Sequence, residues 1–245
     1  MAKGGHSDDR NLEHPCAVGH SDPPDRRLGG SPRMTTLLHV EASPRGEVSR
    51  STQAARLFIE ALQAADPSLA VDHLDLWQAD LPPFDGAALT AKYARLAGRN
   101  HDGPEATAWA KIETMVGRID KTDCLLLSTP MWNFSIPYRL KHWIDLITQP
   151  GLSFSFNPAT GYTPVLRPRP ALAILASAGD YTTGESRGRP DLATPYLRAA
   201  LGFIGLTDLT IVPIWPTIGS GAEEAAEVAA ERLCCLARGF AGAGT

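Results

Sequence analysis

The sequence predicts a single α/β domain in which a doubly wound, five-stranded parallel sheet carries helices on both faces. Strand-like apolar runs alternate with helical patterns from residue 34 onward. This alternation is typical of a parallel sheet whose strands are buried on both sides. The length of 245 residues suits one such domain with a sizeable core. A second domain is therefore not required.

The expected elements follow one another in a regular order. Short apolar runs predict strands at 35–40, 70–76, 123–128, 171–176 and 207–214. Helical patterns predict helices at 49–65, within 86–119, and at 137–147, 191–204 and 222–240. Two insertions break this rhythm: 79–102 lengthens the second crossover, and 153–169 forms a proline- and aromatic-rich loop. Such insertions act as lids or dimer contacts, or are inert surface loops.

Composition excludes several classes of protein. Lys+Arg 23 against Asp+Glu 27 gives a formal net charge of -4, which argues against a nucleic-acid-binding surface. No apolar run is long enough to span a bilayer. The cysteines Cys16, Cys124, Cys234 and Cys235 lack C-x-x-C spacing, so neither a disulfide framework nor a zinc site is indicated. We expect a reducing cytoplasm, with Cys234 and Cys235 on the apolar face of a helix.

Residues 1–33 differ from the rest of the chain. They are rich in Gly, Pro, Asp and Arg, and they contain no aromatic residue and no apolar period. Such a segment cannot bury enough surface to offset its ordering entropy, so we expect a disordered tail. It has no apolar h-region of a secretory signal, and its acidic residues argue against a transit peptide. Its scattered histidines His6, His14 and His20 do not indicate a metal site.

A hydroxyl-rich loop follows the first expected strand and leads into a helix. A helix N-terminus offers free amides and the positive end of the helix dipole to an anion. The side chains that could contact phosphate oxygens are those of Ser43, Arg45, Ser49, Arg50, Ser51 and Thr52. The alternative is that Ser49 only caps the helix. Because the spacing matches neither a nucleotide triphosphate loop nor a dinucleotide site, a monophosphate is the better prediction.

A second candidate loop, 128–137, joins the third expected strand to a helix. It places Met131, Trp132, Asn133 and Phe134 at the carboxyl end of a strand, where open α/β sheets bind ligands. The amides and the Asn side chain could hold a flat aromatic ligand such as an isoalloxazine ring, with Met, Trp and Phe packed against it. The alternative is a tight turn with buried aromatic residues.

These two segments resemble the FMN-dependent NADH-azoreductase and quinone reductase family, a branch of the flavodoxin-like fold. The family's phosphate motif S-x-R-x-x-x-S-x-S is matched by Ser43, Arg45, Ser49 and Ser51, and its flavin motif M-[YW]-N-F-x-[IV]-P is matched by 131–137. Further matches lie at 140–145, 150–154, 194–197 and 201–205. The resemblance implies strand order 2-1-3-4-5, with both loops at the switch point between the first and third strands.

A third ligand loop departs from the family pattern. Relatives commonly carry Ser-Arg-Gly-Gly, whereas this chain has Ser177, Ala178, Gly179 and Asp180. Ser177 and Gly179 still offer a hydroxyl and close backbone contacts. The cation is lost, and Asp180 would disfavour an anionic reduced flavin through like-charge repulsion. The alternative is that Gly179 and Asp180 form only a turn.

The resemblance implies hydride transfer from NADH or NADPH through FMN to a quinone or azo compound, in two half-reactions. Since the flavin carries this chemistry, no side-chain acid or base is nominated.

The resemblance also implies a homodimer, in which Phe154, Phe156 and Tyr162 either wall the partner's site or pack within their own loop. Arg187 and Arg189 either meet a 2′-phosphate or contact only water. The alternatives are a flavin reductase using FMN as substrate, and a flavodoxin-like electron carrier or redox-responsive binding protein.

Overall fold

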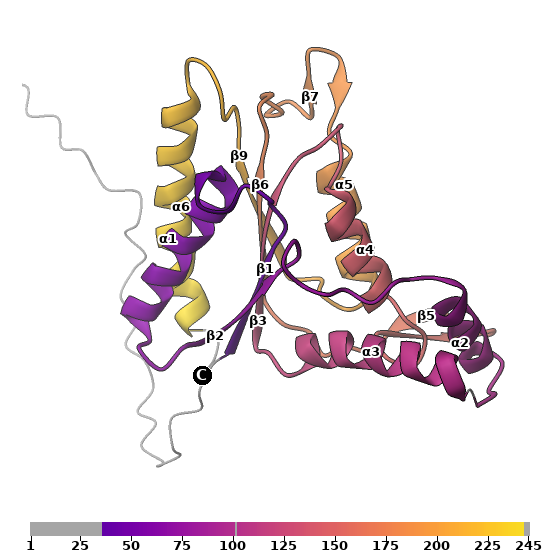
Figure 1. Cartoon of the computed structure of the whole chain (residues 1–245). Helices are drawn as coiled ribbons and strands as arrows, with labels where there is room; N and C mark the ends of the chain where they lie inside the picture. Colours follow the sequence, from indigo (N-terminus) through magenta and orange to yellow (C-terminus); the bar gives the residue numbers. More distant parts are fainter. Residues whose placement is uncertain (1–35, 101, 243–245) are drawn as a thin grey trace, which may run out of the picture. The chain divides into compact units, whose positions relative to one another are not determined.

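The computed structural model describes residues 36–100 and 102–242. The predicted disordered tail, 1–33, lies outside these residues. The central sheet has five parallel strands in the order β2-β1-β3-β6-β9 (Figure 1). The strands are β1 (Thr36–Glu41), β2 (Ala70–Asp75), β3 (Cys124–Pro130), β6 (Ala171–Ala176) and β9 (Leu209–Ile214). In strand sequence this is the order 2-1-3-4-5, so the predicted fold is confirmed.

The helices cover both faces of this sheet (Figure 1). One face packs against α1 (Arg50–Ala65) and α6 (Ala222–Gly242) through a core centred on Phe58 and Leu233. The other packs against α3 (Gly103–Asp120), α4 (Tyr138–Ile147) and α5 (Ala193–Phe203), with Trp109 and Trp143 fully buried. The remaining helix, α2 (Gly86–Leu96), packs on α3. Because β3 and β6 lie at the centre of the sheet, their apolar side chains are buried on both faces.

A buried arginine secures the end of α3. The side chain of Arg169 donates hydrogen bonds to the carbonyl oxygens of Ile119 and Thr122, and it pairs with Asp120 at 3.3 Å. The last carbonyl groups of a helix have no partner within the helix. The guanidinium therefore adds a donor to each of two carbonyl oxygens, which also accept hydrogen bonds from Thr122 and Arg167 respectively.

Two short hairpins were missing from the sequence prediction. The segment expected as a loop at 153–169 contains β4 (Phe154–Asn157) and β5 (Gly161–Pro164), which pair antiparallel. Beyond β6, β7 (Glu185–Ser186) pairs with β8 (Arg189–Pro190). These strands are two to four residues long and mostly exposed, so they carry no clear apolar alternation.

The expectation that Cys234 and Cys235 lie in the core is wrong, because both are exposed. The buried stripe of α6 runs through Ala229, Leu233 and Ala237, at a spacing of four residues. The two positions after Leu233 lie off this stripe.

Candidate active site

Three loops leave neighbouring strands at the carboxyl edge of the sheet. They follow β1, β3 and β6, and backbone hydrogen bonds hold them side by side. The amide of Ala42 donates to the carbonyl oxygen of Ser128 at 2.8 Å, and the amide of Met131 donates to that of Ala176 at 2.7 Å. The structure therefore brings the three predicted ligand loops to one edge, as topology required.

The loop after β1 buries three of its hydroxyl groups without using them as caps. Ser43, Ser49 and Ser51 are all buried, and the hydroxyl oxygens of Ser49 and Ser51 lie 3.1 Å apart. Although Ser49 is the N-cap residue of α1, its side chain makes no capping hydrogen bond, and the first turn contains no acidic residue. The capping alternative is thus contradicted. The first-turn amides of α1 remain available to an anion.

The backbone of the same loop is also suited to an anion. Arg45 has a right-handed helical conformation, and Gly46 follows with φ +52°, at the start of the 3₁₀ turn η1 (Gly46–Val48). Successive amides in such a sequence form a concave anion-binding nest. The Arg45 side chain is exposed, whereas the guanidinium of Arg50 pairs with Glu223 at 2.5 Å. Of the two predicted cations, Arg45 is the one outside an ion pair in the described residues.

The Thr52 hydroxyl has a different role from the predicted phosphate contact. It donates to Glu41 Oε1 at 2.8 Å, while Glu41 Oε2 lies 3.1 Å from His73 Nε2. A hydroxyl has one proton, so Thr52 cannot donate to a phosphate while this bond is intact. Glu41 is buried at the end of β1, directly before the loop predicted to bind phosphate.

His39 extends this buried polar group toward the loop after β3. Its Nε2 lies 2.9 Å from the Ser128 hydroxyl, and its ring stacks on His73 at 5.0 Å between centroids. Burial, followed by the charges of His73 and Arg56, lowers the pKa of His39 to about 3. The imidazole is therefore neutral at physiological pH. Sequence reasoning missed the cluster, although two polar residues within an apolar strand were a usable signal.

The loop after β3 closes as a tight hairpin turn. Trp132 and Ser135 exchange backbone hydrogen bonds of 2.8 and 3.0 Å, and the residues between them, Asn133 and Phe134, have φ +47° and +73°. Positive φ at Phe134 is strained and occurs mainly at functional sites. The side chains of Trp132 and Phe134 are 37% and 41% exposed. The alternative of a turn with buried aromatic residues is thus contradicted.

Trp77, which follows β2, links the first two loops. Its indole nitrogen donates to the carbonyl oxygen of Ala42 at 3.0 Å. Its ring lies 5.7 Å from that of Trp132 and 5.4 Å from that of Tyr138, between centroids. Sequence reasoning did not single out Trp77, because nothing local shows that β2 ends beside the other two loops.

The loop after β6 is compact around its glycine. Ser177 is buried and its hydroxyl accepts from the Gly179 amide at 3.2 Å, whereas Ala178 and Asp180 are exposed. A Cβ on Gly179 would lie 2.8 Å from the Ser186 hydroxyl oxygen, so a larger residue would force the Ser186 side chain in β7 to shift. The hydroxyl and amide of Thr182 donate hydrogen bonds to the carboxylate of Asp180, and these bonds lower the pKa of Asp180. Asp180 is thus a carboxylate at neutral pH, at the position where the family pattern has glycine.

These features fit FMN. Buried hydroxyls, uncapped amides and a nest suit a phosphate, and the exposed aromatic turn, next to the glycine-containing loop, suits a flat ring. Residues 36–100 and 102–242 contain no group of three or more His, Cys, Asp or Glu able to hold a metal ion. No helix in the same residues is both long and apolar enough to cross a membrane.

The sheet order and the three loops define a flavodoxin-like protein, and residues 35–235 match the family model described as "Flavodoxin-like fold". FMN-dependent NADH:quinone oxidoreductase 1 of Bradyrhizobium diazoefficiens is 48% identical over 76% of this chain and 89% of its own. FMN-dependent NADH:quinone oxidoreductase 3 of Pseudomonas fluorescens is 40% identical over 85% of this chain and 98% of its own. The chain belongs to this family of FMN-dependent NADH:quinone oxidoreductases, which confirms the resemblance.

A solved structure with a similar fold is the azoreductase from Bacillus anthracis. It matches with a TM-score of 0.74 and 25% sequence identity, over 84% of this chain and 100% of that one.

Proposed function

We propose that this protein is an FMN-dependent NAD(P)H oxidoreductase that reduces quinones and azo compounds. The observation that carries this proposal is the meeting, at one sheet edge, of an uncapped helix N-terminus lined by buried hydroxyls and an exposed aromatic hairpin. The relatives named as FMN-dependent NADH:quinone oxidoreductases support it, since they match nearly their whole length.

The phosphate of FMN would be held by the loop after β1. Ser43, Ser49 and Ser51 supply hydroxyl donors, the first turn of α1 supplies amides, and the exposed Arg45 supplies charge. Arg50 contributes less charge because Glu223 pairs with it. Hydrogen bonds to a charged phosphate are stronger than those between neutral groups, so a few donors suffice.

The ring of FMN would be held by the other two loops. Met131, Trp132, Asn133 and Phe134 line one side, and 177–180 line the other. When bound, FMN supplies two-electron hydride chemistry between a nicotinamide and the acceptor. The chain's own task is to bind and orient, and the strained turn at Asn133 and Phe134 fixes the amides that would face the ring.

Asp180 would tune this chemistry rather than take part in proton transfer. Its carboxylate is charged at neutral pH and stands in the loop that would border the flavin. A nearby negative charge disfavours any form of the cofactor that gains negative charge on reduction. We therefore expect Asp180 to lower the reduction potential of the bound flavin.

We also infer a homodimer in which the β4–β5 hairpin covers the partner's site. Phe156 and Tyr162 are 53% and 62% exposed and pack on each other, with centroids 4.9 Å apart. Phe154 is buried within its own subunit, so it supports the exposed pair of Phe156 and Tyr162 rather than covering a partner.

Sedimentation velocity tests the inferred homodimer. Phe156→Ser should weaken the dimer, whereas the control Val228→Ser on α6 should not, and an unchanged dimer in Phe156→Ser would contradict it.

The proposal is tested by identifying and exchanging the cofactor. The purified protein should be yellow, retain its flavin through gel filtration and release FMN on heating. Removal of FMN should abolish NADH-dependent quinone reduction, and added FMN should restore it. Flavin lost during gel filtration would favour a flavin reductase, and recovery of FAD would contradict the monophosphate site. The expected cytoplasmic location remains part of this proposal.

A further inference from the structure

A cavity of about 630 Å³ lies beside the loop after β6. Its other walls are the β7–β8 hairpin and the segment that follows β9. Figure 1 shows this hairpin beyond the end of the strands, past β6 and β9. The volume falls within the range of small-molecule sites, roughly 300–1,000 Å³.

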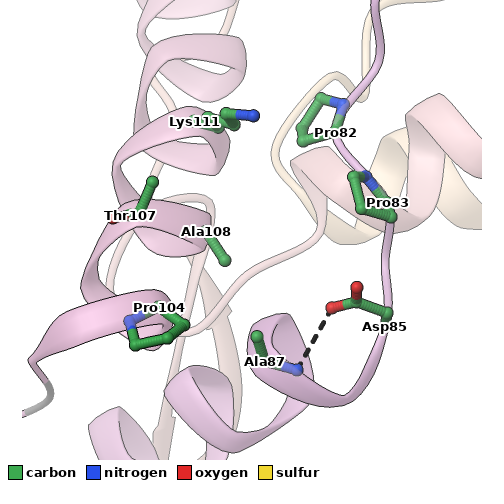
Figure 2. A pocket seen from close by; sticks show the side chains of 8 residues that line it. All are labelled: Pro82, Pro83, Asp85, Ala87, Pro104, Thr107, Ala108 and Lys111. Atoms are coloured by element: carbon green, nitrogen blue, oxygen red, sulfur yellow. Dashed lines mark hydrogen bonds between the residues drawn. The ribbon is translucent and has the colours of Figure 1, made fainter.

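A second, smaller cavity of about 290 Å³ lies between α2 and α3 (Figure 2). Prolines line much of it, and its carboxylate, Asp85, already accepts hydrogen bonds as the cap of α2.

Two contacts attach the β7–β8 hairpin to the candidate active site. Gly179 packs closely on Ser186, whose hydroxyl oxygen would lie 2.8 Å from a Cβ at position 179. The amide of Leu192 donates to the carbonyl oxygen of Phe134 at 2.9 Å, which ties the end of the hairpin segment to the loop after β3. The cavity therefore shares one wall, 178–180, with the site proposed for the flavin.

The hairpin turn presents two guanidinium groups at the cavity. Arg187 and Arg189 line it, and neither forms an ion pair with any described residue. Arg189 is oriented by a hydrogen bond of 2.9 Å from its Nε to the carbonyl oxygen of Ser186. Arg187 has φ +52°, a conformation that is uncommon outside glycine and that clusters at binding sites.

The same walls carry two carboxylates and an apolar surface. Asp180 and Glu185 line the cavity with the arginines, and Pro216 and the exposed Ile218 close another side. Equal numbers of positive and negative groups do not attract a simple anion. They suit a ligand with phosphates for the guanidinium groups, hydroxyl donors for the carboxylates and an apolar face.

We propose that this cavity binds the ADP-ribose half of NADH. Arg187 and Arg189 contact the diphosphate, Asp180 and Glu185 accept hydrogen bonds from ribose hydroxyls, and the adenine packs on Ile218. Carboxylates that bind a ribose 2′-hydroxyl disfavour a 2′-phosphate, so the cavity selects NADH over NADPH. This inference rests on the proposed function, in which NADH is the hydride donor.

The direct test is binding of ADP-ribose to the FMN-loaded protein by titration calorimetry. The variant Arg187→Asn with Arg189→Gln removes both charges, and Asn tolerates positive φ. We expect its Kd for ADP-ribose to rise at least tenfold, while the control Arg232→Gln in the middle of α6 keeps the wild-type Kd. Equal Kd values for the double variant and the wild type would overturn the inference.

A second comparison separates this inference from the proposed function. Reduced nicotinamide mononucleotide lacks the adenylate, so it should reduce the double variant and the wild type at equal rates, whereas NADH should show a higher half-saturation concentration with the variant. Wild-type protein that NADH does not reduce would contradict the proposed function itself. Glu185→Gln should narrow the preference for ADP-ribose over its 2′-phosphate, and an unchanged preference would contradict the assignment of that carboxylate.

Discussion

Replacing the two buried serines at the start of α1 should weaken FMN binding on the order of 100-fold. In Ser49→Ala with Ser51→Ala, two hydroxyls that are 4% and 0% exposed are removed. A hydrogen bond to a charged group is worth roughly 1.5–3 kcal/mol. Because these hydroxyls already lie 3.1 Å from each other, a phosphate replaces an existing contact and the low end applies. Two such bonds supply about 3 kcal/mol, which corresponds to about two powers of ten in Kd.

The assay is the quenching of FMN fluorescence on titration with apoprotein. Ser68→Ala, beyond the end of α1, is the matched control and should leave the Kd unchanged. Urea unfolding of the same proteins controls for stability: since the Ser49 side chain makes no capping hydrogen bond, the loss of about 1 kcal/mol that removal of a cap causes is not expected. A double variant that binds FMN as tightly as the wild type would refute the assignment of the phosphate site.

Three further outcomes follow from the structure. Arg169→Leu should lower the free energy of unfolding by about 2 kcal/mol, measured by urea denaturation, because its hydrogen bonds to the carbonyl oxygens of Ile119 and Thr122 are lost, at roughly 1 kcal/mol each; an unchanged free energy of unfolding would contradict that role. The pKa of His39 falls from 6.5 in the unfolded chain to about 3 in the folded protein, so the unfolded state binds more protons and stability should fall as pH drops from 6.5 toward 3. The slope contributed by this one group is at most about 1.4 kcal/mol per pH unit, and His39→Gln should flatten it; equal slopes would show that other groups dominate. Double-reciprocal plots at several NADH concentrations should be parallel if nicotinamide and quinone take turns at one flavin face, as two half-reactions imply; intersecting lines would contradict a shared face.

The sheet was predictable because its central strands are apolar. The runs that became β3 and β6 are buried on both faces, so their composition alone marks them as interior strands. The short hairpins were not predictable in the same way. Phe156 and Tyr162 pair across β4 and β5 and remain exposed, so their pattern does not differ from that of a loop.

The site was predictable where it depends on local sequence, and not where it depends on distant partners. Ser43, Ser49 and Ser51 lie within one short loop. The partner that removes Thr52 from the phosphate site is Glu41, on the strand before that loop, and the partner of Arg50 is Glu223, 173 residues away. Trp77 likewise depends on how β2 is placed beside β1. Such contacts follow from tertiary packing, which the spacing of residues does not encode.

The central claim, that bound FMN connects NADH to a quinone, is tested most directly by an anaerobic titration of the purified protein. Absorbance of the oxidised flavin should disappear with one equivalent of NADH per FMN, and one equivalent of a quinone should restore it. Flavin that stays oxidised in NADH, although the protein holds FMN, would contradict the account and favour an electron carrier.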